Sequence, residues 1–460
     1  MGITAAYMVP HPPLIVPEIG RGEEAGIQDT IHAYEEIGRR IAADRPETIV
    51  LVSPHQTMYA DYFHISPGAE AAGDFGRFCA PQVRITVSYD TEFVNALCAQ
   101  ARTADFPAGT AGEREPRLDH GTMVPLYFVN RHWESYRLVR IGLSGLPLRQ
   151  HYELGQYIRK TAEALGRKTV VIASGDLSHR LKEDGPYGYR EEGPAYDARL
   201  MEAMGSGAFG KLFAFSEDFC DRAGECGHRS FVMMAGALDG MDVKAERLSY
   251  EGPFGVGYGV CAYRETERAA GRHFLMRYEE DERMRLARRR TAEDDWVRLA
   301  RRTITEYVRN GRVIEVPEGL PAELYHQRAG VFVSIKEDGR LRGCIGTIQA
   351  VQASVAEEII QNAVSASTRD PRFPPITADE LERLVISVDV LGETERAASM
   401  ADLDVKRYGV IVTKGAKRGL LLPNLEGVDT VEEQVSIARQ KAGIGAWEDV
   451  ELERFEVIRH

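Results

Sequence analysis

The sequence predicts an α/β fold with an N-terminal mixed β-sheet flanked by helices, followed by a smaller α+β domain. Apolar, β-branched runs alternate with amphipathic runs over residues 1–263, which is typical of a sheet covered by helices. A charged stretch then interrupts the pattern, and a second alternating region occupies the rest of the chain. The 460 residues are enough for two or three domains.

The first region is expected to contain seven strands and five helices. Runs rich in Val, Ile and Tyr predict strands at 3–9, 48–53, 83–88, 136–143, 169–174, 244–250 and 255–263. Amphipathic runs between them predict helices at 26–43, 92–101, 149–165, 196–204 and 229–238. This order gives a first domain over residues 1–265.

Residues 266–290 are rich in Glu, Arg and Met and show no clear apolar face, so they predict an exposed helical connector. The second domain is expected over 291–460. Thr291, with Asp294 three residues later, is the candidate N-cap of its first helix, at 296–308. Further strands are predicted at 330–335, 384–391 and 410–413, and further helices at 354–366 and 430–442.

Composition narrows the class of protein. The net charge of -13 and the lack of a basic run disfavour nucleic-acid and anionic-membrane partners. No apolar run approaches the ~18 residues of a membrane span, and the N-terminus lacks the basic segment of a secretion signal. The six cysteines form no Cys-x-x-Cys pair, which favours free thiols in a reducing cytoplasm. A homo-oligomer is compatible with these features.

Four histidines in the first 180 residues lie in segments suited to a metal site: His11, His55, His120 and His179. His11 and His55 each follow a predicted strand, where open α/β sheets place ligand-binding groups. Two histidines and one carboxylate are a common ligand set for oxygen-activating Fe(II), and they leave positions open for substrate and dioxygen. We therefore expect His11 and His55 to bind one metal ion.

These segments together resemble the class III extradiol dioxygenase (LigB-type) domain and its relative, the Memo family. The resemblance covers residues 1–265 and includes Asp119-His120-Gly121 and Ser174–His179. It implies that His11 and His55 are metal ligands, that Asp119 and His120 support the site, and that His179 is the catalytic acid/base. Asp176 departs from the pattern, because glycine is commoner there.

The third metal ligand has two candidates in the segment Ala223–His228. Ring-cleaving members of the family place a glutamate in this region, which Glu225 matches, whereas Memo-type members place a cysteine, which Cys226 matches. Glu225 would complete an oxygen-activating iron site, and Cys226 would favour a softer metal. His228 is either a further pocket group or a hydrogen-bonding residue at a helix start.

The resemblance implies an Fe(II)-dependent dioxygenase that cleaves a catechol-like aromatic substrate with dioxygen. In it His179 would move the phenolic proton, and His120 would hydrogen-bond the substrate or the oxygen intermediate. The alternative is a Memo-type redox or scaffold protein that holds iron or copper and docks a partner. A zinc hydrolase would need only the same histidines and a bound water.

The second domain carries the segment Leu341-Arg342-Gly343-Cys344-Ile345-Gly346. This segment resembles the AMMECR-type domain, which recurs with a Memo-type domain and a radical-SAM protein in the AmmeMemoRadiSam grouping, so a radical-SAM partner is implied. Cys344 is either a nucleophile activated by Arg342 or His326, or a buried structural cysteine. The nearby charged residues Arg369, Asp370 and Arg372 fit a groove for an anionic ligand or a surface ion-pair set.

Overall fold

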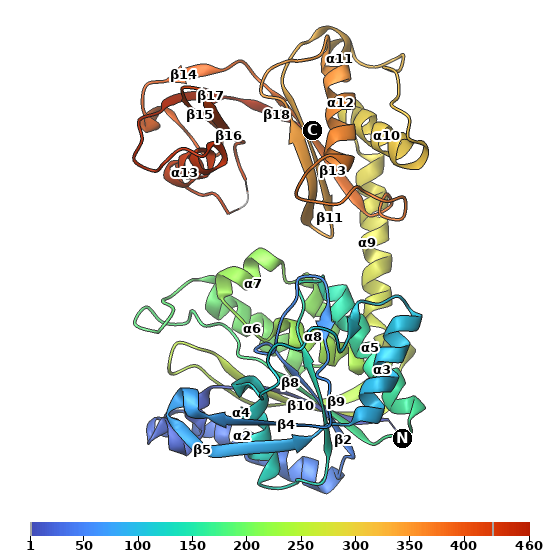
Figure 1. The fold of residues 1–460 in the computed structure, drawn as a ribbon, viewed down its shortest axis with the longest axis vertical. Coiled ribbons are helices and arrows are strands. Elements are labelled where there is room, and N and C mark those ends of the chain that lie inside the picture. The colour runs from blue at the N-terminus through green and yellow to red at the C-terminus, as the bar shows by residue number, and fades with distance from the viewer. Residues whose placement is uncertain (1, 426) are drawn as a thin grey trace. The chain divides into compact units, whose positions relative to one another are not determined.

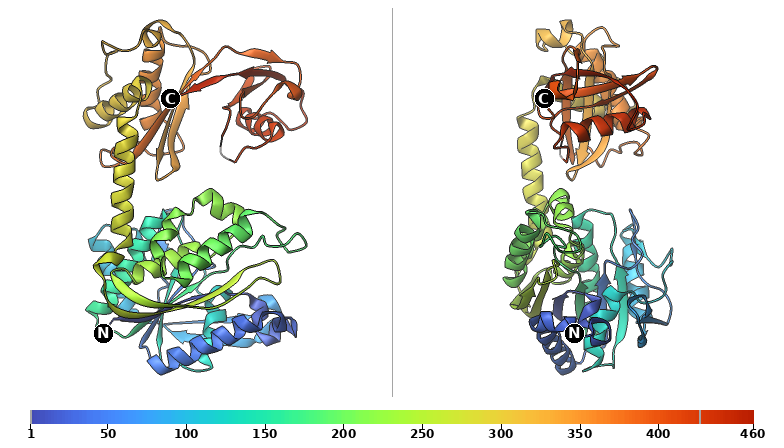
Figure 2. Two further views of the ribbon diagram at one scale, coloured as in Figure 1. Left: turned by 180° about the vertical axis from the view of Figure 1, so that it is seen from behind. Right: turned by 90° about the vertical axis from the view of Figure 1, so that its left-hand side faces the viewer.

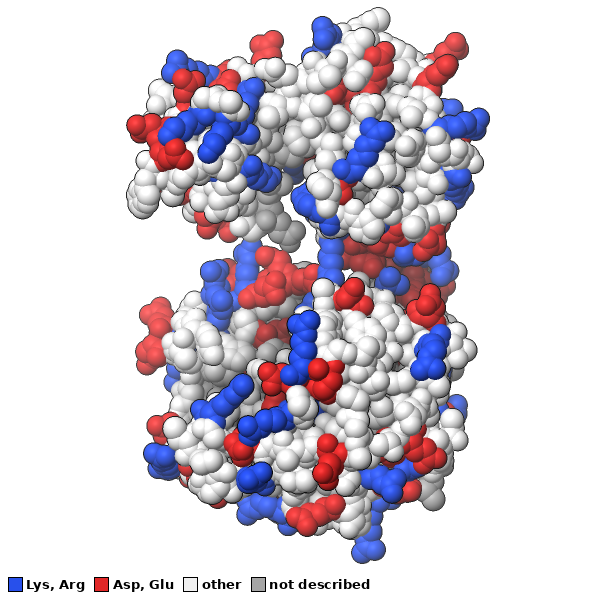
Figure 3. Space-filling view, viewed as in Figure 1, with Lys and Arg blue, Asp and Glu red and all other residues white. Residues whose placement is uncertain are grey.

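The computed structural model describes residues 2–425 and 427–460, which form two compact units, Met1–Glu280 and Asp281–His460 (Figure 1). Each unit is described by itself. No helix within the described residues combines the length and the apolar character needed to cross a membrane. Basic and acidic side chains are interspersed over the face drawn in Figure 3.

The first unit is built on one six-stranded sheet in the order β7-β2-β8-β1-β10-β9. The first four of these strands are parallel, β10 runs antiparallel to β1, and β9 runs antiparallel to β10. The sheet is therefore mixed, as the sequence predicts. Its strands are β1 (Ile3–Val9), β2 (Thr48–Ser53), β7 (Arg137–Gly142), β8 (Thr169–Ser174), β9 (Met241–Glu251) and β10 (Tyr258–Arg268).

Helices cover both faces of this sheet (Figures 1 and 2). Side chains of β1 alternate between two apolar clusters, with Tyr7 in one and Met8 in the other, as the period of two along a strand requires. One cluster includes α2 (Gln28–Asp44) and α4 (His120–Asn130). The other includes α3 (Thr91–Thr103), α5 (Leu148–Ala164), α6 (Glu192–Gly205) and α8 (His228–Ala237). Burial on both faces explains the continuous apolar character of the central strands.

Several elements of the first unit lie outside the pattern predicted from sequence. Helix α4 contains Pro125 and is buried almost all round, so it lacks the one-sided apolar period that identifies a helix. Strand β4 (Glu70–Phe75), which pairs with β5 (Ala80–Ser88), contains no β-branched residue. The other short elements are α1 (Pro17–Gly20), β3 (Phe63–His64), β6 (Ala108–Gly109) and α7 (Glu217–Ala223).

Helix α9 (Phe274–Thr291) precedes the helix that opens the second unit, α10 (Asp295–Asn310). The predicted N-cap at Thr291 is wrong by three residues. Thr291 ends α9, and its hydroxyl donates to the Ala287 carbonyl at 3.0 Å. Asp294 caps α10 instead, because its carboxylate accepts the Val297 N–H at 3.1 Å and a carboxylate near a helix start is also favoured by the helix dipole.

The second unit contains two four-stranded sheets. The first has the order β12-β11-β13-β18 and packs one face against α10, α11 and α12. The second has the order β14-β17-β15-β16 and packs against α13. Their elements are α11 (Ala322–His326), β11 (Val331–Glu337), β12 (Arg340–Gly346), α12 (Val355–Thr368), β13 (Leu384–Leu391), β14 (Glu395–Ala397), β15 (Gly409–Lys414), β16 (Lys417–Leu421), α13 (Val431–Ala442), β17 (Glu451–Phe455) and β18 (Val457–Arg459).

Candidate metal centre

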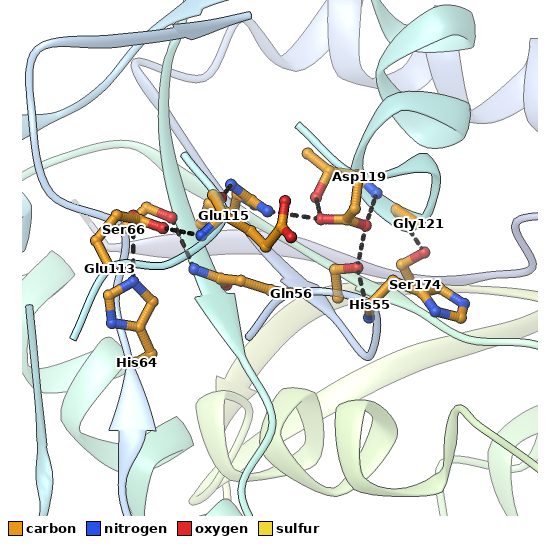
Figure 4. Close-up of polar contacts among 12 residues, drawn as sticks. His55, Gln56, His64, Ser66, Glu113, Glu115, Asp119, Gly121 and Ser174 are labelled. Carbon is orange, nitrogen blue, oxygen red and sulfur yellow. Dashed lines mark hydrogen bonds and ion pairs between the residues drawn. The ribbon is translucent and has the colours of Figure 1, made fainter. Parts of the chain in front are cut away.

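The candidate metal centre lies at the carboxyl edge of the parallel strands in the first unit. His11 follows β1, His55 follows β2, and the segment from Gly175 to His179 follows β8. Because these strands are parallel neighbours in the order β2-β8-β1, their carboxyl ends meet at one edge. Figure 4 shows His55 and Ser174 gathered there with Asp119 and Gly121 from the start of α4.

Three side chains offer ligand atoms close together: His11, His55 and Cys226. The His11 Nε2 atom lies 2.9 Å from His55 Nε2 and 3.6 Å from Cys226 Sγ. All three ligand atoms lie within 4.8 Å of one another, and no other such group of histidine, cysteine or acidic side chains occurs among the described residues. Two imidazole nitrogens and a sulfur are suitable donors for iron, copper or zinc.

The orientation of the His11 ring follows from its hydrogen bonds. The Ser174 hydroxyl donates to the Gly121 carbonyl at 2.6 Å, which leaves its oxygen as the acceptor for His11 Nδ1–H at 2.9 Å. The His11 Nε2 lone pair therefore faces His55 and Cys226. Burial lowers the pKa of His11, as does the charge of His55, so its imidazole is neutral at physiological pH. A neutral, oriented imidazole is what a metal ion requires.

Cys226 reaches the centre because two loops approach closely. A Cβ on Gly175, after β8, would lie 2.1 Å from the Gly227 Cα, so only glycine fits there. The Cys226 sulfur accepts the Asp176 N–H at 3.3 Å. Burial, reinforced by the charge of Asp176, raises the pKa of the Cys226 thiol well above its usual range. The thiol therefore stays protonated until a metal displaces the proton.

Asp176 is buried at 7% exposure rather than facing solvent. Its carboxylate accepts the His11 backbone N–H at 2.7 Å and so fixes the chain that carries this histidine. Burial raises the pKa of Asp176. The acid that departs from the family pattern thus joins the β8 loop to the β1 loop.

Glu225 and His228 lie outside the group of three. The Glu225 carboxylate accepts the His228 N–H at 2.6 Å at the start of α8, and burial raises the pKa of Glu225 to about 7. His228 is buried, with Nε2 at 3.1 Å from the Leu212 carbonyl oxygen and Nδ1 at 3.3 Å from the Tyr196 hydroxyl. Of the two adjacent candidates for the third ligand, the structure brings Cys226 to the histidines and directs Glu225 to the helix.

Asp119 and His120 begin α4 beside the two histidines. The Asp119 carboxylate accepts hydrogen bonds from the Ser53 hydroxyl at 2.6 Å and from Arg140 at 2.9 Å. Burial raises the pKa of Asp119, but Arg140 and the hydrogen bonds together hold it below its usual value. Arg140 is fully buried and was not predicted from sequence. The available signal was an arginine within the apolar run of β7, since a buried cation needs a partner.

The His120 ring centroid lies 4.0 Å from that of His55 and 5.4 Å from that of His11. Burial and the charges of His55 and His11 lower the pKa of His120 to about 3, so this imidazole is neutral. His179 donates from Nδ1 to the Gly224 carbonyl in a short hydrogen bond, and its Nε2 has no hydrogen-bond partner among the described residues. His179 lies in the same loop after β8 as Asp176 and is not one of the three residues of the ligand group.

A cavity of about 400 Å³ opens onto His55 and His120. The Phe78 ring lies 5.3 Å from the His120 ring and forms part of its wall. The remaining wall mixes apolar with charged side chains, from Asp74, Arg77, Glu115, Arg117, Leu118, Asp119 and Met123. The site is therefore accessible to a small molecule.

Comparison with known families identifies both units. A family model described as the catalytic LigB subunit of aromatic ring-opening dioxygenase matches residues 5–261, and the AMMECR1 family model matches residues 297–460. The chain belongs to the LigB family through its first unit, and an AMMECR1 unit follows. The resemblance indicated by the sequence is thereby confirmed.

Relatives cover either the whole of this chain or part of it. A protein of Clostridium acetobutylicum is 43% identical over 100% of this chain and 99% of its own length. A Thermotoga maritima protein is 55% identical over 35% of this chain and 92% of its own length. Among solved structures, an uncharacterised Pyrococcus horikoshii protein is 35% identical, with 36% of this chain and 91% of that chain covered and a TM-score of 0.34. An uncharacterised Escherichia coli K12 protein is 14% identical. The match covers 56% of this chain and 99% of that chain, with a TM-score of 0.37.

Proposed function

We propose that this chain is a Memo-type redox metalloprotein that binds iron or copper through His11, His55 and Cys226. The observation that carries the proposal is the His-His-Cys set, and the bond of Glu225 to the start of α8 supports Cys226 as the third ligand. Thiolate ligands favour soft or redox-active metals, whereas a carboxylate would have favoured a hard, oxygen-activating iron site.

The three ligand atoms fit a metal ion. An ion with nitrogen ligands at about 2.0–2.1 Å and sulfur at about 2.3 Å, in tetrahedral geometry, separates its ligand atoms by roughly 3.3–3.6 Å. The distance of 3.6 Å between His11 Nε2 and Cys226 Sγ agrees with this range, and the 2.9 Å between the two Nε2 atoms is shorter than it, so the two rings must separate slightly to hold an ion. Both imidazoles are neutral lone-pair donors, because burial lowers the pKa of each.

The surrounding residues have distinct tasks in this proposal. Iron or copper, when bound, supplies one-electron redox chemistry. Ser174 fixes the His11 tautomer, and Asp176 fixes the His11 backbone. His120 presents a neutral imidazole to the cavity, and His179 takes or returns a proton at Nε2, since its Nδ1 is held by Gly224.

Metal titration of paired variants tests the ligand set. Cys226→Ser is expected to weaken iron or copper binding by about 100-fold or more, since even loss of outer partners costs roughly 10–100-fold. Glu225→Gln, the adjacent control, should leave the affinity within about threefold, because its carboxylate bonds the His228 N–H instead. A thiolate-to-metal absorption band should vanish only in Cys226→Ser. The reverse pattern would show that Glu225 is the ligand.

A second candidate is oxygen-dependent cleavage of a small catechol-like aromatic compound, and the cavity beside His55 favours it. That cavity has an aromatic wall at Phe78 and a neutral imidazole at His120. Incubation of the Fe(II)-loaded chain with catechols and dioxygen should then give a yellow product, and His179→Ala should abolish it. If the iron-loaded chain gave no product with any catechol tested, the ring-cleaving candidate would be wrong and only the redox metalloprotein would stand.

The AMMECR1 match supports a further proposal about partners. We propose that the chain works with a radical-SAM protein, the third member of the grouping to which the sequence resemblance points. Direct binding between the two purified proteins, measured by calorimetry, tests this. No heat of binding at micromolar concentrations would contradict it.

A further inference from the structure

The cysteine that stands out in the second unit, Cys344, is bonded within the fold. The Ser334 hydroxyl donates to its sulfur at 3.2 Å. Asp370 accepts the Cys344 N–H at 2.9 Å, and Arg342 pairs with Glu380 at 2.6 Å. These contacts explain how the residues are held and give no evidence of a ligand.

In the first unit, a buried histidine holds the loop that forms one wall of the cavity beside the metal centre. Residues 110–118 lie between β6 and α4. Three of them, Glu115, Arg117 and Leu118, line that cavity. His64 ends β3, which pairs with β6, and its side chain is fully buried. The position of this loop therefore depends on what His64 contacts.

Both nitrogens of the His64 ring face acceptors in this loop. Nδ1 lies 3.0 Å from the Ala111 carbonyl oxygen, and Nε2 lies 3.2 Å from the Glu113 carboxylate (Figure 4). The other carboxylate oxygen of Glu113 accepts the Glu115 N–H at 3.1 Å. The contact between His64 and Glu113 thus orders the loop up to the residues of the cavity wall.

The contact between His64 and Glu113 requires a shared proton. A carbonyl oxygen only accepts, so Nδ1 carries the proton of the bond to Ala111. On a neutral ring Nε2 is then a lone pair, which repels an ionised carboxylate. The contact is attractive only when one more proton lies on the ring or on the carboxylate.

The other polar groups near the pair do not replace this proton. The Tyr59 ring lies 6.4 Å from the His64 ring, and the Tyr62 hydroxyl accepts a backbone N–H of the loop at 3.4 Å. The Arg114 guanidinium lies over the Tyr59 ring at 5.3 Å. Arginine is permanently cationic and so opposes a second proton on His64, whereas the carboxylate of Glu113 favours it at shorter range.

We propose that His64 and Glu113 form a pH-sensitive latch that controls access to the cavity beside the metal centre. While the pair holds its shared proton, residues 110–118 stay in place as the cavity wall. Histidine is the side chain that ordinarily gains or loses a proton between about pH 5 and 8. The closed loop holds one proton more than the released loop, so rising pH releases the loop and opens the cavity.

Hydrogen exchange of the intact, metal-free chain tests the latch. Mass spectrometry of peptides covering residues 110–118 gives their protection at about pH 5.5 and about pH 8.5, on either side of the histidine range. An unstructured peptide supplies the intrinsic pH dependence of exchange. Protection should fall about tenfold or more at the higher pH, since a hydrogen bond to a charged group has at least this effect on an equilibrium. Equal protection at both pH values would overturn the proposal.

Two variants separate the shared proton from the bond itself. Glu113→Gln can donate its amide N–H to a neutral His64 Nε2 and still accept the Glu115 N–H, so protection should stay high at both pH values. His64→Asn keeps a donor for the Ala111 carbonyl but does not reach Glu113, so protection should be low at both. A melting curve checks that this second variant folds. A pH-dependent fall that persisted in Glu113→Gln would contradict the latch.

Glu35→Gln is the matched control. Glu35 on α2 pairs with His132, which follows α4, at 2.6 Å. The pair is of the same kind but lies outside residues 110–118, so this variant should keep the pH-dependent fall in their protection. Loss of the fall in Glu35→Gln would assign the response to that pair and overturn the proposal.

Metal release shows whether the latch controls access to the metal centre, and this measurement rests on the proposed function. At the higher pH a chelator should remove iron or copper several-fold more slowly from Glu113→Gln than from the natural chain. At the lower pH the two rates should agree. Because the two proteins are compared at one pH, protonation of the metal ligands cancels. Equal rates at both pH values would refute control of access, whereas a chain that binds no metal would refute the proposed function and leave the exchange test standing.

Discussion

At the scale of single residues, the chemistry of the first unit depends on which of two neighbours faces the histidines. Cys226 and Glu225 are consecutive in an irregular loop, so their side chains have different partners. The Cys226 sulfur meets His11, and the Glu225 carboxylate meets the first N–H of α8. Which of these two consecutive residues faces the histidines therefore decides whether the site offers a thiolate or a carboxylate. The two kinds of site favour different metals and different redox chemistry.

The Ser174 hydroxyl is expected to tune metal affinity without binding the metal. Ser174→Ala removes the acceptor for His11 Nδ1–H. The tautomer of His11 that presents its Nε2 lone pair to a metal is then no longer stabilised by this hydrogen bond. Metal affinity should fall by about 10-fold, at the lower end of the range for outer partners of ligating histidines. Competition with a chelator measures this fall. Ser178→Ala, which removes a hydroxyl bonded to the Ala223 carbonyl, is the control and should leave the affinity unchanged.

Sequence alone locates some of these residues and not others. His11 and His55 follow strands whose β-branched runs are easily identified, and parallel strands bring such positions together. The choice between Glu225 and Cys226 depends on loop dihedrals that no periodic pattern encodes. Arg140 was missed because a single charge in an apolar strand does not reveal its partner, Asp119, which lies in another element.

At the scale of elements, the site depends on how closely the loop after β8 approaches the loop before α8. Gly175→Ala would place a methyl group 2.1 Å from the Gly227 Cα, so one loop must move away. The separation of the two loops shifts the Cys226 sulfur relative to the two histidines. Metal affinity should therefore fall at least about tenfold, an effect as large as that of losing an outer partner of a metal ligand. Gly205→Ala, whose methyl meets only the Arg247 Cβ at 3.5 Å, should retain full affinity.

Asp197 on α6 should make stability depend on pH. Its carboxyl accepts the Ser178 N–H and the Tyr250 hydroxyl, both at 2.8 Å, but burial dominates and raises its pKa to about 7. Folding therefore favours the protonated acid. This contribution is fully present below the unfolded pKa near 3.8 and is lost as pH rises to about 7.

Urea unfolding of the metal-free protein at several pH values measures this effect. Between pH 4 and 7 the unfolding free energy of the natural chain should fall relative to Asp197→Asn, by at most about 1.4 kcal/mol per pH unit. The amide keeps an acceptor for Ser178 but does not titrate. Asp61→Asn, which changes an exposed acid, is the control. Its unfolding free energy should change with pH as that of the natural chain does. If the unfolding free energies of the natural chain and of Asp197→Asn changed with pH in the same way, Asp197 would be ionised in the folded protein over this whole pH range.

Elements were predictable where burial is one-sided or where β-branched residues dominate. Strands β1, β2 and β8 match their predicted limits, and α13 begins one residue after its predicted start. Helix α4 carries His120 yet escaped prediction, because residues buried on every side leave no amphipathic period. Strand β12 carries Cys344 but contains two arginines and two glycines, so it lacks the composition of a strand.

At the scale of the whole molecule, the two units have separate hydrophobic cores. Two apolar clusters contain only residues up to Tyr278, and three contain only residues from Trp296 onwards. The three candidate metal ligands all lie in the first unit. Because no core is shared, we expect each unit to unfold with its own transition.

Calorimetry of the full chain with and without metal tests this independence. A ligand that binds only the folded first unit stabilises it by about 2.7 kcal/mol when present at 100 times its Kd, and gives the second unit nothing. Metal should therefore raise the midpoint of one transition and leave the other in place. Cys226→Ser should remove the shift while both transitions persist, because the thiol bonds only within the first unit. If metal moved both midpoints together, the two units would unfold as one body, and the independence expected from their separate cores would be wrong.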